Sequence, residues 1–294
     1  MGIDNKYLVS TNLSIPEDLY VRVAGINTRY WQMGNRGSTI VLLHGGTGSI
    51  EFWLYNIAAL AQSHQVYAFD MVGSGKSDFP VADYSLTYQT KFLASFMSKL
   101  GIVSATLIGN SMGGGVALQF VGLYPDRVDK LVLVDSLGFG REISLGIRLI
   151  TLPAIVSLLR PGRWMIPVMV RANFDDGSKI SSEWLELRYQ VFALPGRNPA
   201  ILKLGQSNFN VCGVRADVYQ PILASLATIA QKTLIVWGES DRIIPVKHAY
   251  TAAAGIPNSQ LEILEHCGHH PYLEYPDKFN RLVLKFLLSN PSYL

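Results

Sequence analysis

Residues 109–113 read Gly-Asn-Ser-Met-Gly and contain the serine best placed to act as a nucleophile. They follow a run of β-formers, Ala105 to Ile108, and lead into the helix-like segment Met112 to Tyr124. A Gly-x-Ser-x-Gly sequence at a strand-to-helix turn is typical of a nucleophile elbow, in which a strained backbone exposes the serine oxygen. Glycines are needed on both sides because side chains there would collide in so sharp a bend. We therefore expect Ser111 to attack a carbonyl carbon.

Such a serine needs a histidine that takes its proton and a carboxylate that orients the histidine. The strand-like run Thr233 to Val236 leads into a loop that contains Asp241, which is the expected carboxylate. Glu239 on the same loop is an alternative. Asp135 is a second alternative, because it directly follows another strand-like run, Leu131 to Val134.

Three histidines follow the last strand-like run, Gln260 to Leu264. We expect His269 to be the proton carrier, because it follows the flexible Gly268 and completes the chain order serine, aspartate, histidine. His266 and His270 are its rivals. A metal site built on the three histidines is disfavoured, because no cluster of carboxylates or cysteines completes a coordination sphere, although one cysteine and one glutamate lie beside them.

A glycine-rich loop, residues 44–48, follows the first buried strand and reads His-Gly-Gly-Thr-Gly. Its backbone N–H groups can approach a substrate closely, and those of Gly46 and Met112 are expected to form an oxyanion hole. His44 itself is expected to organise the loop rather than to carry protons. Three further residues are expected to contact the substrate: Gly45, Asn110 and His270.

Strand-like and helix-like segments alternate along most of the chain. Eight runs are expected to be strands: Leu19 to Val23, Thr28 to Met33, Thr39 to Leu43, Val66 to Phe69, Ala105 to Ile108, Leu131 to Val134, Thr233 to Val236 and Gln260 to Leu264. The first two are expected to pair antiparallel, and most others are continuous apolar runs typical of parallel strands covered on both faces. Helical patterns lie between most of them: Phe52 to Gln62, Leu86 to Leu100, Met112 to Tyr124, Lys247 to Ala254 and Asp277 to Leu288. This alternation predicts an α/β fold with a doubly wound, mostly parallel sheet.

Residues 138–221 interrupt the alternation. They contain no strand of similar quality and are rich in Leu, Ile, Arg, Pro and Trp in helix-like pieces. The interval is far longer than an ordinary connection between elements. We therefore expect a helical lid, or cap domain, over residues 138–221, inserted into a core domain formed by residues 1–137 and 222–294.

Composition and charge exclude several classes of protein. The 294 residues carry 25 Lys and Arg against 22 Asp and Glu in a dispersed arrangement, so nucleic acid is not an expected partner. Cys212 and Cys267 lie too far apart to indicate a zinc site or a disulfide framework, and they favour reduced thiols in a cytoplasmic protein. Residues 1–14 lack the apolar stretch of a secretory signal, and no apolar run is long enough to span a membrane. The sequence leaves homo-oligomer formation open.

From about Asp18 to Leu288 the chain resembles the α/β-hydrolase superfamily. Besides the elbow and the glycine-rich loop, the resemblance rests on Phe69-Asp70 followed by Gly73-x-Gly75-x-Ser77, Tyr124-Pro125-Asp126-Arg127-Val128, Gly238-x-x-Asp241-Arg242-x-x-Pro245, Gly268-His269 and Phe279. Within the superfamily the chain looks most like the meta-cleavage-product hydrolases, which cut carbon–carbon bonds in ring-fission dienoates, and like small-molecule carboxylesterases. Residues 109–114 and 280–283 carry this closer similarity.

In the dienoate hydrolases a lid arginine binds the substrate carboxylate, and the resemblance places Arg188 in that role. From its residue type alone, a lone lid arginine more often faces solvent or pairs with a neighbour such as Glu183 or Glu186. The chain also differs from those enzymes in two ways. Its glycine-rich loop is shorter, and His270 stands where they usually have a tryptophan.

Together these features predict a serine hydrolase of small, mostly apolar carboxylic esters that forms an acyl-enzyme on Ser111 and uses neither a metal nor an organic cofactor. Besides an acyltransferase or perhydrolase that uses the same three residues, two alternatives stay open. One is a carbon–carbon bond hydrolase of meta-cleavage dienoates, in which the same residues act and Arg188 binds the substrate carboxylate. The other is a non-catalytic ligand receptor on the same fold.

Overall fold

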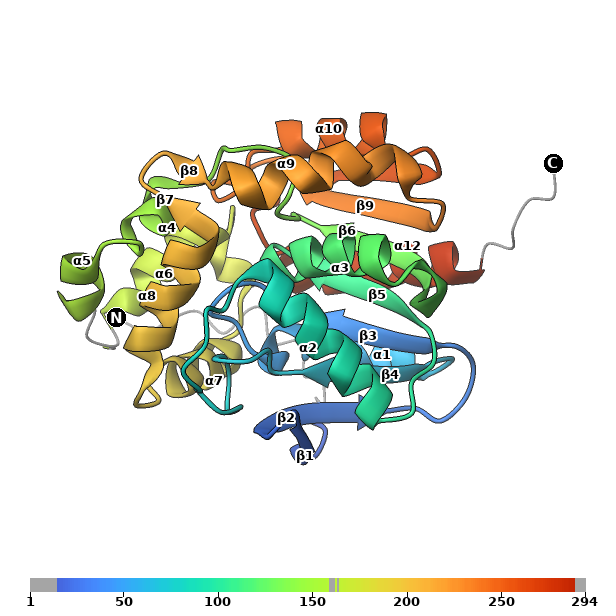
Figure 1. Cartoon of the computed structure of the whole chain (residues 1–294), viewed down its shortest axis with the longest axis horizontal. Coiled ribbons are helices and arrows are strands. Elements are labelled where there is room, and N and C mark those ends of the chain that lie inside the picture. Colours follow the sequence, from blue (N-terminus) through green and yellow to red (C-terminus); the bar gives the residue numbers. More distant parts are fainter. Residues whose placement is uncertain (1–14, 159–161, 163, 289–294) are drawn as a thin grey trace.

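A mostly parallel sheet of eight strands forms the centre of the molecule (Figure 1). The computed structural model describes residues 15–158, 162 and 164–288. In spatial order the strands are β1 (Leu19–Val23), β2 (Ile26–Met33), β4 (Gln65–Phe69), β3 (Thr39–Leu43), β5 (Ala105–Asn110), β6 (Val128–Val134), β9 (Lys232–Gly238) and β10 (Ser259–Leu264). β2 pairs antiparallel with β1 and β4, and all other neighbours in the sheet are parallel. The predicted fold class is confirmed.

The chain winds in both directions from β3, which lies between β4 and β5 although it precedes both in the sequence. In open parallel sheets a crevice forms at the carboxyl ends of the strands where the winding direction changes. The glycine-rich loop follows β3, and Ser111 follows β5. The topology therefore brings both segments to one edge of the sheet.

The sheet separates two apolar cores. One core holds side chains of α2 (Leu86–Lys99), α3 (Met112–Leu123), α9 (Ala216–Ser225) and α10 (Lys247–Gly255), and the other holds side chains of α1 (Ile57–Ala61), α11 (Pro271–Glu274) and α12 (Pro276–Leu288). Successive residues of a strand alternate between them: in β6, Leu133 joins the first core, and Val132 and Val134 join the second. This burial on both faces explains why the parallel strands are continuous apolar runs.

The helix predicted from Phe52 to Gln62 is divided in the structure. A short 3-10 helix, η1 (Ile50–Trp53), precedes α1, and Asn56 lies between the two. The Asn56 side chain donates hydrogen bonds to the backbone oxygen of Tyr272 (3.1 Å) and to Oδ1 of Asn280 (2.9 Å). These tertiary contacts hold the chain at Asn56 and override the local preference for one continuous helix.

The described residues within 138–221, here called the helical segment, lie mostly in helices, as the helix-like pieces in the sequence predict. α4 to α8 lie together beside one end of the sheet (Figure 1). The helices are α4 (Leu145–Leu149), α5 (Pro153–Leu158), α6 (Met165–Asn173), η3 (Gly177–Lys179), α7 (Ser182–Phe192) and α8 (Arg197–Asn208), and two further 3-10 helices elsewhere are η2 (Pro125–Arg127) and η4 (Leu226–Thr228). A ladder of two-residue strands, β7 (Phe209–Asn210) and β8 (Gly213–Val214), was not expected there. The predicted boundary at residue 221 falls inside α9, and the division into core and lid domains stays a prediction.

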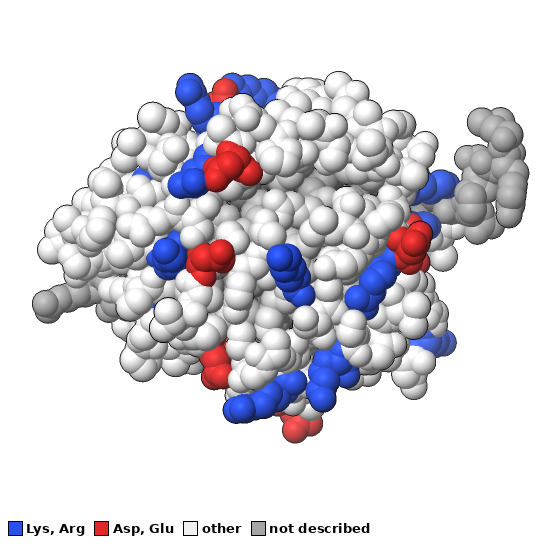
Figure 2. Space-filling view, in the orientation of Figure 1, with Lys and Arg blue, Asp and Glu red and all other residues white. Residues whose placement is uncertain are grey.

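Acidic and basic side chains are interspersed over the face drawn in Figure 2, with no single-sign surface. That nucleic acid is not a partner stays a prediction. Among the described residues no helix is long and apolar enough to cross a membrane. The predicted lack of a secretory signal concerns residues 1–14, which lie outside the described part of the chain.

Candidate active site

Ser111 occupies the sharp turn between β5 and α3, with φ of 54° and ψ of −119°. Residues other than glycine rarely adopt this backbone conformation. It costs energy, which the surrounding structure must offset. A Cβ atom at Gly109 would lie 2.5 Å from the backbone of Gly113, and one at Gly113 would lie 2.3 Å from the backbone oxygen of Leu43. Neither site tolerates a larger residue, so the glycines permit the turn as predicted. Ser111 is partly exposed and lines a cavity.

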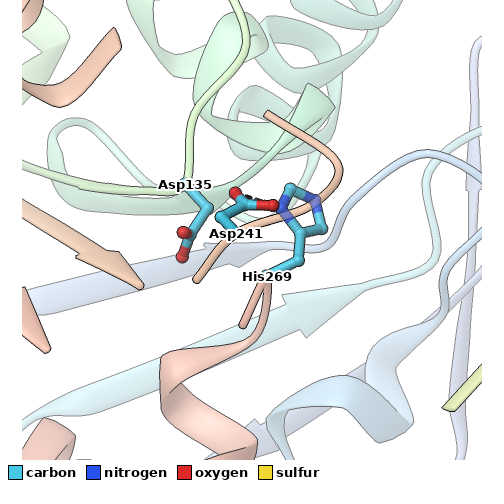
Figure 3. A group of neighbouring side chains, drawn as sticks. All are labelled: Asp135, Asp241 and His269. Atoms are coloured by element: carbon cyan, nitrogen blue, oxygen red, sulfur yellow. Dashed lines mark hydrogen bonds and ion pairs between the residues drawn. The ribbon is translucent and has the colours of Figure 1, made fainter. Parts of the chain in front are cut away.

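His269 and Asp241 form a buried hydrogen-bonded pair (Figure 3), with 2.8 Å between Nδ1 and Oδ2. The second carboxylate oxygen, Oδ1, accepts hydrogen bonds from the backbone N–H groups of Ile243 (2.7 Å) and Ile244 (3.0 Å). Because Nδ1 donates to Asp241, Nε2 of His269 is available to accept a proton. His269 and Ser111 line the same cavity. No hydrogen bond joins them in the described part of the chain, and such contacts are often long in enzymes without substrate.

Asp135, the alternative carboxylate, follows β6 and is fully buried beside Asp241 (Figure 3). Its Oδ1 accepts a hydrogen bond from the backbone N–H of Gly238 (2.9 Å), and its Oδ2 has no partner among the described residues. No hydrogen bond joins Asp135 to His269, so the structure pairs the histidine with Asp241 instead. Burial and the charge of Asp241 raise the pKa of Asp135 well above its usual value of 3.8. In its neutral form Asp135 has a proton that it can donate to Asp241.

Asp135, Asp241 and His269 are also the described residues spaced closely enough to hold a metal ion, with ligand atoms within 4.8 Å of one another. Hydrogen bonds already engage both oxygens of Asp241, Nδ1 of His269 and one oxygen of Asp135. The donor set therefore fits a hydrogen-bonded network, and the expectation that no metal is used stays a prediction.

Asp135→Asn is expected to increase the free energy of unfolding more at pH 8 than at pH 5. A raised pKa means that folded Asp135 keeps a proton which the unfolded chain releases above about pH 4. This contribution to wild-type stability is complete below pH 4 and is lost as the pH rises toward the pKa in the folded state. The asparagine keeps an acceptor for Gly238 and a donor for Asp241 but has no proton to lose. Urea unfolding at both pH values measures the difference, which is at most about 1.4 kcal/mol per pH unit; a difference independent of pH contradicts this account.

The glycine-rich loop after β3 lies against the elbow. Gly45, Gly46 and Met112 line the cavity together with Ser111. A Cβ atom at Gly45 would lie 3.0 Å from Oδ1 of Asn110 and 3.2 Å from Cβ of Ser111, so a side chain there would push the loop away. This close approach is what an oxyanion hole made from the N–H groups of Gly46 and Met112 requires.

His44 holds the glycine-rich loop in place. Its Nδ1 lies 2.7 Å from the backbone oxygen of Gly45, and its Nε2 accepts a hydrogen bond from the N–H of Met71 (3.0 Å). These partners require a neutral ring with the proton on Nδ1. Burial lowers the pKa of His44 to about 4, although the hydrogen bond to Gly45 opposes this shift. The geometry agrees with a loop-organising role.

A cavity of about 430 Å³ opens beside Ser111, a size suited to a small molecule. The helical segment contributes mostly apolar side chains to its wall, among them Ile147, Met169, Phe174, Trp184 and Leu204. The elbow, the glycine-rich loop and His269 form the polar side of the cavity. A bound ligand would therefore contact apolar surface over most of its length and polar groups near the serine.

Arg188 on α7 also lines the cavity and is only 4% exposed. Its Nη2 donates a hydrogen bond to the backbone oxygen of Thr47 (2.7 Å). The guanidinium lies over the rings of Phe52 and Phe192, at 5.2 and 5.4 Å from their centroids. Its Nε and Nη1 have no hydrogen-bond partner in the described part of the chain. Arg188 therefore lines the cavity and has two buried donors without a partner among the described residues.

The structure overturns the interpretation of Arg188 as a surface arginine paired with Glu183 or Glu186. The side chain is buried, and no carboxylate in the described residues forms an ion pair with it. Burial and the nearby charge of Arg197 lower the pKa of Arg188 to about 9. The group is still charged at neutral pH, so it favours an anionic ligand.

A model of the family described as alpha/beta hydrolase fold matches residues 38–276 of the chain. The chain belongs to the α/β-hydrolase fold family. The strand-to-helix elbow, the paired His269 and Asp241 and the sheet topology described above agree with this membership. The resemblance predicted from the sequence is confirmed.

Relatives of this α/β hydrolase include proteins named for different activities. The acetyltransferase component of the acetoin cleaving system of Cupriavidus necator is 34% identical over 91% of this chain and 68% of its own length. The 2-hydroxy-6-oxo-6-phenylhexa-2,4-dienoate hydrolase of Comamonas testosteroni is 31% identical over 88% of this chain and 90% of its own. A solved meta-cleavage product hydrolase from Pseudomonas fluorescens is 27% identical, with a TM-score of 0.78 over 92% of this chain and 97% of its own.

The other predicted contact residues of this α/β hydrolase also lie at the cavity. His270 and Asn110 both line it and are joined through Tyr272, whose hydroxyl donates to Oδ1 of Asn110 (3.1 Å) and lies 3.0 Å from Nδ1 of His270. The rivals His266 and Glu239 are exposed and do not line the cavity. Of the three histidines, two are therefore part of the site, and they are consecutive in the chain.

Sequence reasoning missed the contacts that hold the glycine-rich loop against the helical segment. The backbone oxygen of Thr47 accepts hydrogen bonds from both Arg188 and Arg197 (2.7 and 3.0 Å). Arg197 donates in addition to the backbone oxygen of Val191 (2.6 Å). Burial lowers the pKa of Arg197 to about 10. In the sequence Arg197 is one of several arginines within a largely apolar segment, and this pattern does not indicate a partner.

Proposed function

We propose that this α/β hydrolase cleaves a carbon–carbon bond in a dienoate of the meta-cleavage class, the alternative considered from the sequence. The observation that carries the proposal is Arg188, a buried cation at the cavity with two unpartnered nitrogens. A buried charge without a partner is costly, and a ligand of opposite charge removes that cost. A substrate carboxylate supplies this charge, whereas an ester with apolar groups on both sides does not. The dienoate hydrolases among the relatives support the same class.

In the proposed reaction Oγ of Ser111 attacks the ketone carbon of the substrate while Nε2 of His269 takes the serine proton. Asp241 orients the histidine and stabilises its charged form. The N–H groups of Gly46 and Met112 bind the negative oxygen of the tetrahedral intermediate. Before the bond breaks, the 2-hydroxy-dienoate tautomerises to its keto form, in which the hydroxyl proton has moved to the carbon next to the ketone. The bond between that carbon and the attacked carbon then breaks, and its electron pair is delocalised onto the former hydroxyl oxygen. The proton on His269 passes to this dienolate, and the acyl group stays on Ser111.

Water then attacks the acyl-enzyme through the same histidine, and a carboxylic acid leaves. A carbon leaving group needs a place for the electron pair of the broken bond, and the keto form of the dienoate delocalises this pair toward its carboxylate end. A guanidinium at that end favours the negative charge electrostatically. Side chains and backbone groups of the protein take every role in this scheme, so no metal or organic cofactor is included in the proposal.

Ester hydrolysis is the second candidate, because the cavity wall is mostly apolar apart from Arg188. Attack, oxyanion binding and deacylation would use the same groups. The two candidates differ in what they require of Arg188. A dienoate needs its charge, and a small apolar ester does not.

Arg188→Gln is expected to lower kcat/KM for 2-hydroxy-6-oxo-6-phenylhexa-2,4-dienoate about 10- to 150-fold relative to kcat/KM for p-nitrophenyl butyrate, the range for losing a charge-assisted hydrogen bond. Glutamine keeps an N–H donor for the backbone oxygen of Thr47, so the glycine-rich loop retains one of its contacts. Steady-state kinetics of both substrates with both proteins measures the ratio, and the ester reports on the state of the serine and histidine.

Arg171→Gln is a matched control, because Arg171 is an exposed arginine of the same helical segment and does not line the cavity. It should leave the ratio unchanged. If wild type turns over the ester well but not the dienoate, or if Arg188→Gln lowers both activities equally, carbon–carbon hydrolysis is the wrong assignment and ester hydrolysis takes its place.

A further inference from the structure

The side-chain amide of Asn110 has a defined orientation. Its Nδ2 donates to the backbone oxygens of Val134 (3.1 Å) and His269 (3.2 Å). Carbonyl oxygens only accept hydrogen bonds, so the amide nitrogen must face them and Oδ1 must face Tyr272. Asn110 is fully buried, and Oδ1 therefore needs a donor within the protein. The hydroxyl of Tyr272, at 3.1 Å, is that donor.

This contact determines where the ring of His270 carries its proton. The Tyr272 hydroxyl has one proton, which Oδ1 of Asn110 receives, and its oxygen also lies 3.0 Å from Nδ1 of His270. Nδ1 must therefore be protonated and donate to the tyrosine oxygen. The opposite assignment would leave two buried acceptors, Oδ1 of Asn110 and the tyrosine oxygen, without these donors, which is unfavourable.

Nε2 of His270 is then the unprotonated nitrogen of a neutral ring. Burial, with the neighbouring charges of His269 and Arg188, lowers the pKa of His270 well below 6.5, so the ring does not take a second proton at neutral pH. Nε2 has no hydrogen-bond partner in the described part of the chain and is not among its fully buried atoms. Because His270 lines the cavity, Nε2 presents a free electron pair to a bound ligand.

His270 lies close to the groups that would bind the two ends of the reacting part of a dienoate. Its ring centroid is 5.0 Å from that of His269 and 5.1 Å from that of Phe52. The same Phe52 ring contacts the guanidinium of Arg188, which lies 5.2 Å from its centroid. His270 lines the same cavity as Ser111 and Arg188, so we expect a ligand that extends from Ser111 to Arg188 to come close to its ring.

We propose that Nε2 of His270 accepts a hydrogen bond from a hydroxyl group of the substrate, located between the carbonyl attacked by Ser111 and the carboxylate bound by Arg188. This inference rests on the proposed function and adds a requirement to it. The enol hydroxyl of a 2-hydroxy-dienoate lies next to the carboxylate and meets the requirement. The low basicity of the ring makes His270 a hydrogen-bond acceptor that selects the substrate, and not a second proton carrier.

The test measures ligand binding to the Ser111→Ala variant, which retains the cavity but cannot turn over the substrate. Dissociation constants are determined by absorbance titration for 2-hydroxy-6-oxo-6-phenylhexa-2,4-dienoate and for its analogue without the 2-hydroxyl group. With His270 present, the hydroxylated compound should bind about five- to tenfold more tightly than the analogue. Adding His270→Phe, which keeps a flat ring but has no acceptor, should reduce this ratio to about one, and His270→Gln should restore part of it.

His266→Asn is the matched control, because it alters an exposed histidine four positions away, and asparagine tolerates the positive φ of 51° at that site. It should leave both dissociation constants unchanged. A ratio that His270→Phe does not alter overturns the inference while leaving dienoate binding, and hence the proposed function, intact. Failure of both compounds to bind overturns the proposed function.

The tautomer can be tested without any substrate. Nitrogen-15 NMR distinguishes protonated from unprotonated ring nitrogens, and the inference expects a proton on Nδ1 and none on Nε2 of His270 at pH 7. Tyr272→Phe removes the oxygen that accepts from Nδ1 and should mix the two tautomers. A proton on Nε2 in the unaltered ring would refute the role of His270 as an acceptor, whatever substrate the protein takes.

Discussion

Ser111→Ala is expected to lower kcat on both the dienoate and the ester by about 10⁵- to 10⁶-fold, the largest effect of any single substitution in this chain. Alanine removes the attacking oxygen and leaves the cavity, the oxyanion donors and the pairing of His269 with Asp241 in place. The remaining activity would come from binding and oxyanion stabilisation alone. Circular dichroism and thermal unfolding of the variant establish that its fold is unchanged, and single-turnover kinetics measure the loss.

The same substitution separates an enzyme from a ligand receptor. A fluorophosphonate should label wild-type protein at Ser111 and should not label Ser111→Ala. Ser74→Ala is a suitable control, because Ser74 is a buried serine whose hydroxyl has no partner in the described residues and which does not line the cavity. It should be labelled like wild type. Folded wild-type protein that takes no label and turns over neither substrate would be a receptor.

The fold could be predicted because its parallel strands have a strong local signature. Strands such as β3 are buried on both faces, so nearly every residue in them is apolar, and the helices between the strands bring the carboxyl ends of the strands to one edge. Residues that follow different strands therefore lie near one another at this edge of the sheet, for many different loop conformations. Ser111, Asp241 and His269 follow β5, β9 and β10, and the positions of these strands in the sheet explain why three distant segments share one site.

The strand pattern could not show which of two candidate carboxylates orients His269. Asp135 and Asp241 each follow a buried strand, and what distinguishes them is the path of the loop beyond. The loop after β9 directs two backbone N–H groups toward Oδ1 of Asp241 and places Oδ2 of the same carboxylate against His269. The loop after β6 places Asp135 on the backbone of Gly238. Contacts of this kind depend on the assembled structure and leave no pattern in the local sequence.

The burial of Arg188 is a second feature that the local sequence does not predict. From residue type alone an arginine on a helix is expected at the surface, because burying a guanidinium is costly. Here the packing of α7 against η1 and the glycine-rich loop encloses the side chain between Phe52 and Phe192. The favoured function therefore shifts from apolar esters, which the composition of the helical segment predicts, to a substrate with a carboxylate, which the unpartnered guanidinium favours.

Asp241→Asn is expected to lower kcat about 10⁴-fold on both substrates, although the substitution changes almost no volume. The backbone N–H groups of Ile243 and Ile244 now donate to Oδ1, and in the variant they will retain the amide oxygen at that position. The amide nitrogen must then face His269 and donate to Nδ1. The histidine is forced to carry its proton on Nε2, where it can no longer accept the proton of Ser111.

Asp135→Asn is the matched control, because it makes the same chemical change at the adjacent buried carboxylate, which has no hydrogen bond to His269. Its effect on kcat should stay within about tenfold, since asparagine keeps both the acceptor and the donor of the neutral acid. Steady-state kinetics of both variants, with unfolding curves to show that each is folded, decide between the two carboxylates. If Asp135→Asn lost more activity than Asp241→Asn, the residue that orients His269 during turnover would be Asp135, and the loop after β9 would have to rearrange when substrate binds.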